Sequence, residues 1–473
     1  MGESRIKIRQ DIEKWFDAHA DELLDDLRRL IAVKSVRGIA ADGAPYGAGP
    51  REALSLVSGM LEERGFAVTN FEDIVITADI DAHPPHMGIL SHVDVVGVGD
   101  GWDTDPFEMA IIKDKIFGRG ATDNKGPTIA AMYAMYCAHE LCPDMKKGFR
   151  LIIGSGEELG CIDVAQYLEK NTPPPNVFTP DAGYPVVNTE KGRFAPFFKA
   201  AWEKDTRLPR VVSIQGGKTM NVVPDNASAV VEGFSLDEAE RFCSEYSAAT
   251  GAKMTSRQDG VQIIIESKGV SSHAASPESG VNAQTALIRM LAAMPFAQSA
   301  GFEYICALDR LLPHGDNGGH ALGVAMSDEL SGGLTVNFGV LRFSEDEFSG
   351  NLDSRTPACA DAVDLPGIAR AAFEKERITM YNHTISECHH TPEDGDFVQA
   401  LLRIYEEYTG DPDKSCLAIG GQTYVHGVPG GVAFGSVFPG EENCIHGANE
   451  FIGLEQLVLN AKIFAQSIID ICG

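Results

Sequence analysis

Positive charge is scarce in this chain of 473 residues, in which 39 lysines and arginines are outnumbered by 68 aspartates and glutamates. The formal net charge at pH 7 is −29. Because so acidic a chain repels nucleic-acid phosphates and anionic lipid headgroups, we expect neither nucleic acid nor a membrane as a partner. Long apolar runs are missing as well, since no stretch reaches the roughly 18 apolar residues that a membrane-spanning helix needs.

Closely spaced cysteines are also missing. The chain has ten cysteines, and no two of them form a Cys-x-x-Cys pair. A chain of this length needs no disulfides to hold its fold, and its first residues contain no apolar segment typical of a secretory signal. We therefore expect reduced thiols in a cytoplasmic protein.

The length of the chain predicts two domains rather than one. Up to residue 186, runs typical of strands alternate with segments of helical periodicity, which indicates an α/β fold, a mixed sheet flanked by helices. Residues 187–388 have the pattern of an α+β segment long enough to form its own core, and from residue 389 the first pattern resumes. We predict a discontinuous catalytic domain, 1–186 and 389–473, interrupted by an inserted domain, 187–388.

Five short patches, far apart in the chain, carry the residue types that bind metals and transfer protons. They are Ser91-His92-Val93-Asp94, Gly120 to Gly126 around Asp123, Gly156-Glu157-Glu158, Pro180-Asp181-Ala182 and Ile445-His446-Gly447. They follow predicted strands or precede predicted helices, and such loops gather at the carboxyl edge of an α/β sheet. Two histidines and several carboxylates, with one to spare, suit two divalent ions and a general base, which points to hydrolysis.

Each patch taken singly has a plainer interpretation. His92 suits a buried histidine beside a strand end, and Asp123 or Thr122 suits the N-cap of the helix that follows. Glu157 and Glu158 suit a solvated acidic turn, although adjacent carboxylates repel each other unless a cation or a proton separates them. The two remaining patches suit ordinary loop positions, Asp181 and His446.

Asp94 has a predicted link to His92. Side chains two residues apart on a strand share a face, so Asp94 could bond the second ring nitrogen of His92. Such a bond would fix which nitrogen of the imidazole meets a metal ion.

The sequence around the patches resembles the M20 metallopeptidase family, and within it most of all the peptidase V dipeptidase branch. The resemblance covers nearly the whole chain. It is carried by Ser91 to Val96, Gly99-Asp100-Gly101-Trp102, Gly118 to Pro127, Glu157-Glu158, Asp181, Asn221 to Asp225, Gly269 to Ala274 and Ile445-His446-Gly447.

The resemblance implies a discontinuous zinc-peptidase domain with an inserted lid and a centre of two Zn²⁺ ions, with Mn²⁺ or Co²⁺ as possible replacements. Asp123 would bridge both ions. One ion would be completed by His92 and Asp181, and the other by Glu158 and His446. Paired ions of this kind lower the pKa of a bound water molecule and polarise the substrate carbonyl.

The resemblance also implies the residues around the metals. Glu157 would be the general acid/base, Asp94 an orienting group, and His273 on the insert an oxyanion-stabilising histidine. Asn221 and Arg355 resemble substrate-binding positions, and an arginine can hold a carboxylate with two hydrogen bonds. Plainer interpretations are a structural histidine for His273 and a surface salt bridge for Arg355.

The sequence departs from the family pattern at two places. Gly97 occupies a position where the family usually has proline. His426 ends the stretch from Gly421 where relatives have a basic residue, which puts a basic substrate contact in doubt. Neither position is an expected metal ligand.

The predicted function is zinc-dependent hydrolysis of small peptides, specifically dipeptides with free amino and carboxyl ends. We expect a monomer, because the large insert would let one chain complete its own site. An alternative with the same metal site is an N-acyl amino acid deacylase similar to acetylornithine deacetylase or succinyl-diaminopimelate desuccinylase. An alternative of another class is a non-catalytic metal-binding interaction protein, which the presence of Glu157 disfavours.

Overall fold

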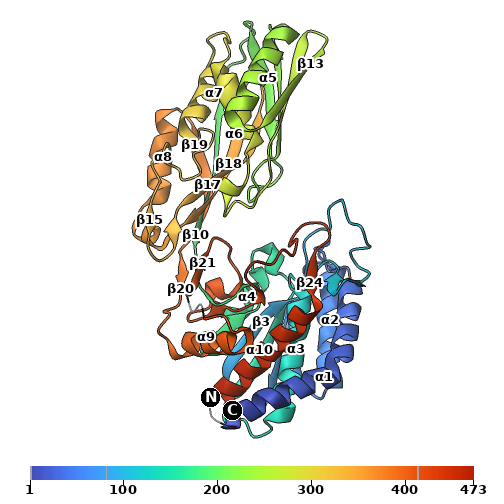
Figure 1. The fold of residues 1–473 in the computed structure, drawn as a ribbon. Coiled ribbons are helices and arrows are strands. Elements are labelled where there is room, and N and C mark those ends of the chain that lie inside the picture. The colour runs from blue at the N-terminus through green and yellow to red at the C-terminus, as the bar shows by residue number, and fades with distance from the viewer. Residues whose placement is uncertain (1–2, 81–82, 413–414) are drawn as a thin grey trace. The chain divides into compact units, whose positions relative to one another are not determined.

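The structure is a computed structural model that describes residues 3–80, 83–412 and 415–473, and the chain divides into two compact units (Figure 1). Unit 1 combines Met1–Thr189 with His390–Leu417 and Gln422–Gly473. Unit 2 consists of Glu190–His389 and Ala418–Gly421. The first unit is therefore built from sequence on both sides of the second.

Unit 1 is built on a mixed sheet. Among the described residues its strand order is β1-β2-β6-β3-β7-β22-β9-β20, with β21 beside β9. The bounds are β1 (Val68–Phe71), β2 (Val75–Ile80), β3 (Pro85–His92), β6 (Gly148–Gly154), β7 (Asn176–Thr179), β9 (Val187–Glu190), β20 (His389–His390), β21 (Leu417–Ile419) and β22 (Val432–Ala433). Strand β3 runs parallel to β6 and β7, whereas β2 runs antiparallel to β6.

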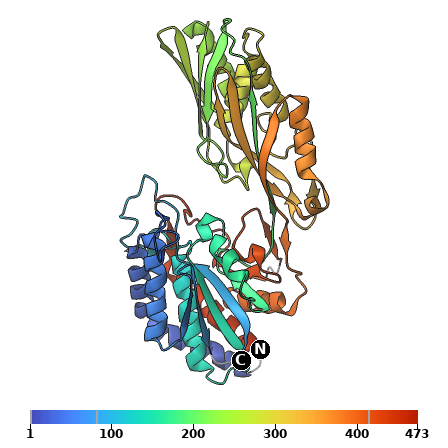
Figure 2. The ribbon, with the colours of Figure 1, turned by 180° about the vertical axis from the view of Figure 1, so that it is seen from behind.

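Helices cover both faces of this sheet. They are α1 (Glu3–Ala32), α2 (Ala48–Glu63), α3 (Lys125–Leu141), α4 (Ile162–Leu168), α9 (Asp396–Thr409) and α10 (Leu454–Cys472). Smaller elements are β4 (Ala110–Ile112), β5 (Lys115–Phe117), β8 (Ala182–Gly183), β23 (Ser436–Val437), β24 (Phe451–Gly453) and the 3-10 turns η1 (Glu157–Leu159) and η4 (Tyr424–Gly427). Figures 1 and 2 show α3 and α10 on one side of the sheet and α4 on the other.

Side-chain alternation along the strands explains the two layers. In β6, Leu151 and Ile153 join the core under α1, α3 and α10, while Ile152 between them joins a second core with α4. In β3, Ile89 and Leu90 divide between the two cores in the same way. A strand buried on both faces has an almost continuous apolar run, which is typical of parallel sheets covered by helices.

Unit 2 is an α+β layer structure with an antiparallel sheet of order β13-β14-β12-β11-β17-β18-β10-β19. The strands are β10 (Gly192–Ala201), β11 (Arg210–Gly216), β12 (Asn226–Glu232), β13 (Lys253–Asp259), β14 (Gln262–Lys268), β17 (Thr335–Phe343), β18 (Glu347–Thr356) and β19 (Thr379–Ser386). The other elements are α5 (Leu236–Thr250), α6 (Ala283–Ala293), α7 (Ala300–Leu311), α8 (Leu365–Lys375), β15 (Ser327–Asp328), β16 (Gly332–Gly333), η2 (Pro277–Ser279) and η3 (Ala358–Ala362).

The helices of unit 2 pack on one face of its sheet, as Figure 2 shows with the sheet in front of them. Local sequence explains where they begin and end. Ser235 and Glu238 form a capping box at the start of α5, and Gly251 ends that helix in the left-handed conformation. Asn282 caps α6 by accepting hydrogen bonds from Gln284 and Thr285.

The predicted α/β fold with a mixed, helix-flanked sheet is confirmed by this architecture. Among the helices of the described residues, none combines the length and apolar character that crossing a bilayer would require.

Candidate metal centre

Three parallel strands of unit 1 bring the predicted patches to one edge of the sheet. His92 is the last residue of β3 and lies opposite Gly154, the last residue of β6. Glu157 follows β6 by three residues, and Asp181 follows the neighbouring strand β7 by two. Because parallel strands end at the same edge, these side chains converge although they are far apart in sequence.

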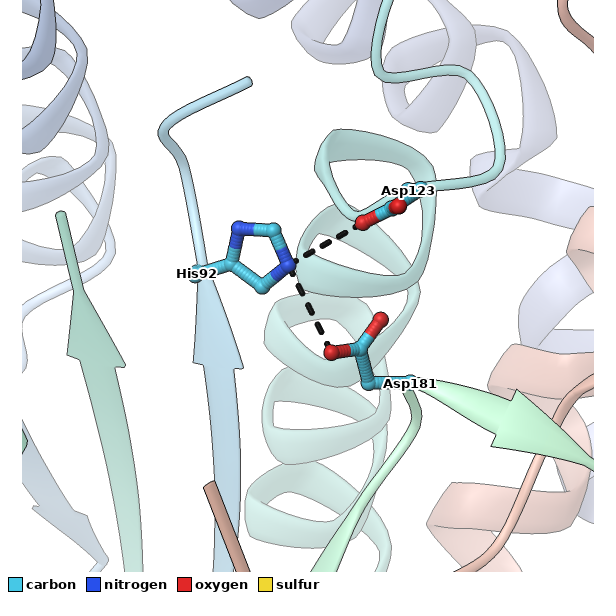
Figure 3. A group of neighbouring side chains, drawn as sticks. All are labelled: His92, Asp123 and Asp181. Carbon is cyan, nitrogen blue, oxygen red and sulfur yellow. Dashed lines mark ion pairs between the residues drawn. The ribbon is translucent and has the colours of Figure 1, made fainter. Parts of the chain in front are cut away.

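One group of possible metal ligands consists of His92, Asp123 and Asp181 (Figure 3). The His92 Nε2 atom lies 3.1 Å from Asp123 Oδ1 and 3.6 Å from Asp181 Oδ2. The three side chains come from the end of β3, the turn before α3 and the loop after β7, and they point toward a common position.

A second group consists of Asp123, Glu158 and His446. The His446 Nε2 atom lies 2.9 Å from Asp123 Oδ2 and 3.3 Å from Glu158 Oε1. Asp123 thus belongs to both groups and directs one carboxylate oxygen to each. In both groups, one ligand atom from each residue lies within 4.8 Å of the others.

The donor atoms in these groups suit cations. The buried atoms His92 Nε2 and Glu158 Oε1 have no hydrogen-bond partner among the described residues. A neutral imidazole nitrogen and a carboxylate oxygen both present lone pairs, so their approach to other carboxylates is repulsive unless a proton or a metal ion lies between them. Imidazole and carboxylate are also the ligands that zinc accepts.

The pKa values of the groups reflect the same crowding. Burial raises the pKa of Glu158 to about 7, and the charge of Asp123 adds to the shift. Burial works against ionisation of Asp123 too, but the imidazoles of His446 and His92 outweigh it and lower the pKa of that carboxyl. Asp123 and Glu158, in turn, raise the pKa of His446 to about 11. The raised pKa values of Glu158 and His446 mean that bound protons offset the negative charge of this site, which metal ions could offset instead.

The turn that carries Asp123 is held by a buried ion pair. Glu450 accepts hydrogen bonds from the backbone N–H groups of Gly120, Thr122 and Asp123, at 3.1, 2.9 and 3.0 Å. Arg119 donates to the same carboxylate at 2.7 Å. With its backbone fixed in this way, Asp123 is not used as a cap of α3, whose N-cap residue is Asn124.

Asn124 connects two of the ligand-bearing segments. Its side-chain amide donates to Asp181 Oδ1 at 2.8 Å and to the Pro180 carbonyl at 3.1 Å. The side-chain oxygen of Asn124, Oδ1, accepts from the Ser91 hydroxyl at 2.5 Å. One buried amide therefore fixes the direction of the Asp181 carboxylate relative to the end of β3.

Asp94 and Asp163 hold the turn of the two glutamates. Asp94 accepts from the backbone N–H groups of Glu157 and Glu158, at 3.2 and 3.1 Å. Asp163 Oδ2 accepts from Ser155 and Gly156 N–H, at 2.7 and 2.8 Å. The Tyr424 hydroxyl donates to the same Asp163 oxygen at 2.7 Å, so four consecutive N–H groups are fixed by two carboxylates.

The predicted bond between Asp94 and His92 takes a different form in the structure. The His92 Nδ1 atom lies 3.0 Å from the main-chain carbonyl of Asp94 and 3.4 Å from its carboxylate. The carbonyl is the nearer partner because the carboxylate turns toward the glutamates. The orientation of the ring is still fixed by Asp94, with Nε2 directed at the ligand group.

Glu157 lies beside the ligand groups without belonging to either of them. Burial raises the pKa of its carboxyl well above the usual range, and the negative charge of Asp181 adds to the shift. The Cys161 thiol donates to Glu157 Oε1 at 3.5 Å. A half-buried carboxyl with a raised pKa, adjacent to a candidate cation site, can both accept and return a proton.

The three remaining predicted residues lie on unit 2. Asn221 and His273 occupy adjoining loops, since Ala274 N–H donates to the Asn221 carbonyl at 2.9 Å. Arg355 lies on β18 with its side chain 7% exposed, and its Nε donates to Asp353 at 2.8 Å. The salt bridge considered for Arg355 exists, but it is buried rather than on the surface.

Sequence reasoning missed the residues that hold the turns. Glu450, Asp163, Asn124 and Tyr424 are all at most 1% exposed. Glu450 lies four residues after His446, and Asp163 lies five after Glu158, so their proximity to the patches was the available signal. Their hydrogen bonds to distant backbone could not be read from the chain.

Comparisons with known proteins show which family this chain resembles. The profile described as "Peptidase family M20/M25/M40" matches residues 88–470. "Putative dipeptidase YtjP" of Bacillus subtilis (strain 168) is 32% identical over 457 residues, which cover 95% of this chain and 97% of that protein. "Putative dipeptidase SH1171" of Staphylococcus haemolyticus (strain JCSC1435) is 31% identical, with 95% and 97% covered.

Two solved structures share the fold at low sequence identity. Human carnosine dipeptidase 1 superposes with a TM-score of 0.57 at 15% identity, covering 99% of both chains. The dipeptidase Dug1p of Saccharomyces cerevisiae gives a TM-score of 0.56 at 13% identity, covering 99% of this chain and 98% of that one. The profile match over residues 88–470 and the two sequence relatives above 30% identity show that the chain belongs to the peptidase family M20/M25/M40.

Proposed function

We propose that this protein is a metal-dependent dipeptidase that hydrolyses small peptides with free amino and carboxyl ends. The observation that carries the proposal is Asp123, which belongs to two groups of possible metal ligands beside the half-buried carboxyl of Glu157, a member of neither group. The two sequence relatives, each aligned over 97% of its own length, are named putative dipeptidases, which supports dipeptides as the substrate class.

Two divalent ions, with Zn²⁺ as the first candidate and Mn²⁺ or Co²⁺ as alternatives, would be held by the two groups. His92 and Asp181 would complete one site, and Glu158 and His446 the other, with Asp123 common to both. When bound, the ions would polarise the scissile carbonyl and lower the pKa of a water molecule.

Glu157 acts as the general acid/base in this proposal. Its carboxylate accepts a proton from the attacking water and then returns it to the leaving amine. Both steps need a pKa between those of the two partners, and burial moves the pKa of Glu157 in that direction. Asp94 fixes the backbone of Glu157 and so keeps the carboxylate in place.

The residues of unit 2 complete the proposal on the substrate side. We assign His273 to stabilisation of the developing oxyanion, and Asn221 and Arg355 to binding of the substrate. On this assignment, residues 1–186 and 389–473 form the catalytic domain, and residues 187–388 form a lid. The link between the loops of Asn221 and His273 supports a common task for them.

The deciding experiment uses purified protein stripped of metal and reloaded with Zn²⁺, Mn²⁺ or Co²⁺ in turn. Dipeptides such as Ala-Ala are compared with N-acetyl and N-succinyl amino acids. We expect turnover of dipeptides that depends on the added ion. Preference for the N-acyl substrates would identify a deacylase, and bound metal without any hydrolysis would identify a non-catalytic binding protein.

We also propose that the protein is a monomer of the cytoplasm. All ten cysteines lie in the described residues and are free, and Cys359 and Cys444 are exposed, which suits a reducing compartment. Light scattering on the purified protein tests the monomer, and fractionation of cells tests the compartment.

A further inference from the structure

A buried charged cluster lies on the sheet of unit 2, on the face that points away from its helices. It consists of Arg193 on β10 and of Asp353 and Arg355 on β18. The sequence neighbours Phe194 and Leu352 belong to the core under the helices, so alternation places the charged side chains on the opposite face. Such a cluster is unexpected there, because an open sheet face normally leaves charges in water.

The cluster is built around one carboxylate. Asp353 is fully buried, and its oxygens accept from Arg193 Nη2 at 2.6 Å and from Arg355 Nε at 2.8 Å. Arg193 and Arg355 are directly opposite each other in the pairing of β10 with β18. Two cations around one anion leave a formal charge of +1 − 1 + 1 = +1 on the three residues Arg193, Asp353 and Arg355.

The two arginines differ in how many donors they have used. Arg355 donates Nε and Nη2 to Asp353, at 2.8 and 3.5 Å, and Nη1 to the Gly420 carbonyl at 2.8 Å. Its side chain is 7% exposed. Arg193 is 26% exposed, and its buried Nε atom has no hydrogen-bond partner among the described residues. A buried guanidinium N–H without an acceptor is unfavourable unless a ligand provides one.

Arg193 also lies beside the loop of Asn221. Its Nη2 atom is 3.1 Å from the sulfur of Met220. The same loop is fixed by the buried Asn337, whose amide donates to the carbonyls of Met220 and Val222 at 2.9 and 3.0 Å. The unsatisfied guanidinium is therefore rigidly placed next to a residue already assigned to substrate binding.

We propose that Arg193 is a second carboxylate-binding arginine, which shares the C-terminal carboxylate of the substrate with Arg355 while Asp353 holds both side chains in register. The inference rests on the proposed function, since it takes a free carboxylate on the substrate for granted. One monoanion brings the charge of the cluster to zero, and paired guanidinium groups bind planar carboxylates through several short hydrogen bonds.

The test compares wild type with Arg193→Gln in the metal-loaded enzyme, using Ala-Ala and its carboxamide. We expect the KM for Ala-Ala to rise about 10- to 100-fold, the usual effect of losing hydrogen bonds to a charged group, with kcat nearly unchanged. The preference for the acid over the amide should fall by the same factor. Arg193→Lys should lie in between, because lysine keeps the charge without the forked geometry.

Arg289→Gln is the control, since Arg289 on α6 forms an ion pair of similar length with Asp309, at 2.7 Å, in a more exposed place of the same unit. Its KM should equal that of wild type. Calorimetric binding of a phosphinic dipeptide analogue and of its carboxamide gives the same comparison without turnover. An unchanged KM and unchanged affinity in Arg193→Gln, or equal losses for acid and amide, would overturn the inference.

Failure of the proposed function has a different signature. If wild type cleaves N-acyl amino acids but not dipeptides, the substrate class is wrong, yet those substrates also carry a free carboxylate. The effect of Arg193→Gln on their KM then still decides whether Arg193 binds it.

Discussion

The two units bury charge in opposite ways. In unit 1, five carboxylates crowd around two imidazoles: Asp94, Asp123, Glu157, Glu158 and Asp181 with His92 and His446. In unit 2, one buried carboxylate, Asp353, lies between two arginines. In the first cluster the carboxylates outnumber the side chains that can carry positive charge. In the second cluster two arginine side chains supply the positive charge.

The difference has a physical consequence. A group of like charges in a buried place is unstable until protons or metal ions neutralise it. A carboxylate bridged by guanidinium groups is already neutralised and keeps its geometry without added ions. Metal dependence should therefore reside in unit 1 alone. The first of the following experiments tests that division, and the others separate the roles of residues within unit 1.

The largest effect is expected for Asp123→Asn, which removes the one charge common to both ligand groups. Bound metal should fall to background, and kcat/KM should drop by more than about a thousandfold, because two-ion catalysis is lost with the ions. The matched substitution in unit 2, Asp353→Asn, should retain full metal content by elemental analysis. Equal metal loss in the two variants would contradict the division between the units.

Glu157→Gln separates proton transfer from metal binding within unit 1. Since Glu157 belongs to neither ligand group, the variant should keep its metal while kcat falls by about 10² to 10⁴, the usual contribution of a general acid/base. Glu158→Gln is the comparison, because it removes a ligand and should lower metal content as well as rate. Metal loss in Glu157→Gln would make that residue a ligand instead.

A pH series measures the charge deficit of unit 1 directly. Glu158 has a folded-state pKa raised from 4.5 to about 7, so the stability gained by its proton is lost as pH rises through that range. The pKa of His446, raised from 6.5 to about 11, makes stability fall further as pH rises above 6.5. The metal-free protein should thus melt at a lower temperature at about pH 8 than at about pH 6.

Added metal should reverse this trend, because ions bind the deprotonated ligands. The increase in Tm on adding Zn²⁺ should be several degrees larger at about pH 8 than at about pH 6. Scanning calorimetry with and without a chelator makes the measurement, and Asp123→Asn should abolish the increase. A metal-induced shift that is independent of pH would contradict the assigned ligands.

The sequence predicts the candidate metal ligands better than it predicts the residues that hold them in place. His92, Asp123, Glu158, Asp181 and His446 follow strands or precede helices, and the parallel order of strands brings such positions together. Their residue types also restrict the chemistry. The mixed sheet was predictable for the same reason, because buried parallel strands have continuous apolar runs that alternate with helical segments.

The supporting residues could not be predicted because their hydrogen bonds are to backbone groups of turns or to side chains far away in the sequence. Glu450 and Asp163 accept several N–H groups of turns whose conformation is known only after folding. The direction of Asp94 was missed for a related reason: its position on the strand indicates His92, but its carboxylate turns to the N–H groups of the glutamates. Arg193 gave no signal, since its partner Asp353 is 160 residues away.

The smallest effect is expected for Tyr424→Phe, which removes one hydrogen bond to Asp163 and leaves the ring. A hydrogen bond to a charged group such as a carboxylate contributes about 1.5 to 3 kcal/mol. Asp163 then holds the N–H groups of Ser155 and Gly156 less firmly, so Glu157 is less well placed and kcat should fall about tenfold with metal content unchanged.

The control is Tyr133→Phe, which breaks a 2.9 Å bond to Asp26 on α1. It should lower Tm comparably without altering kcat. If both variants change only Tm, Tyr424 contributes to stability alone, and Asp163 holds the turn of Glu157 and Glu158 without help from the Tyr424 hydroxyl.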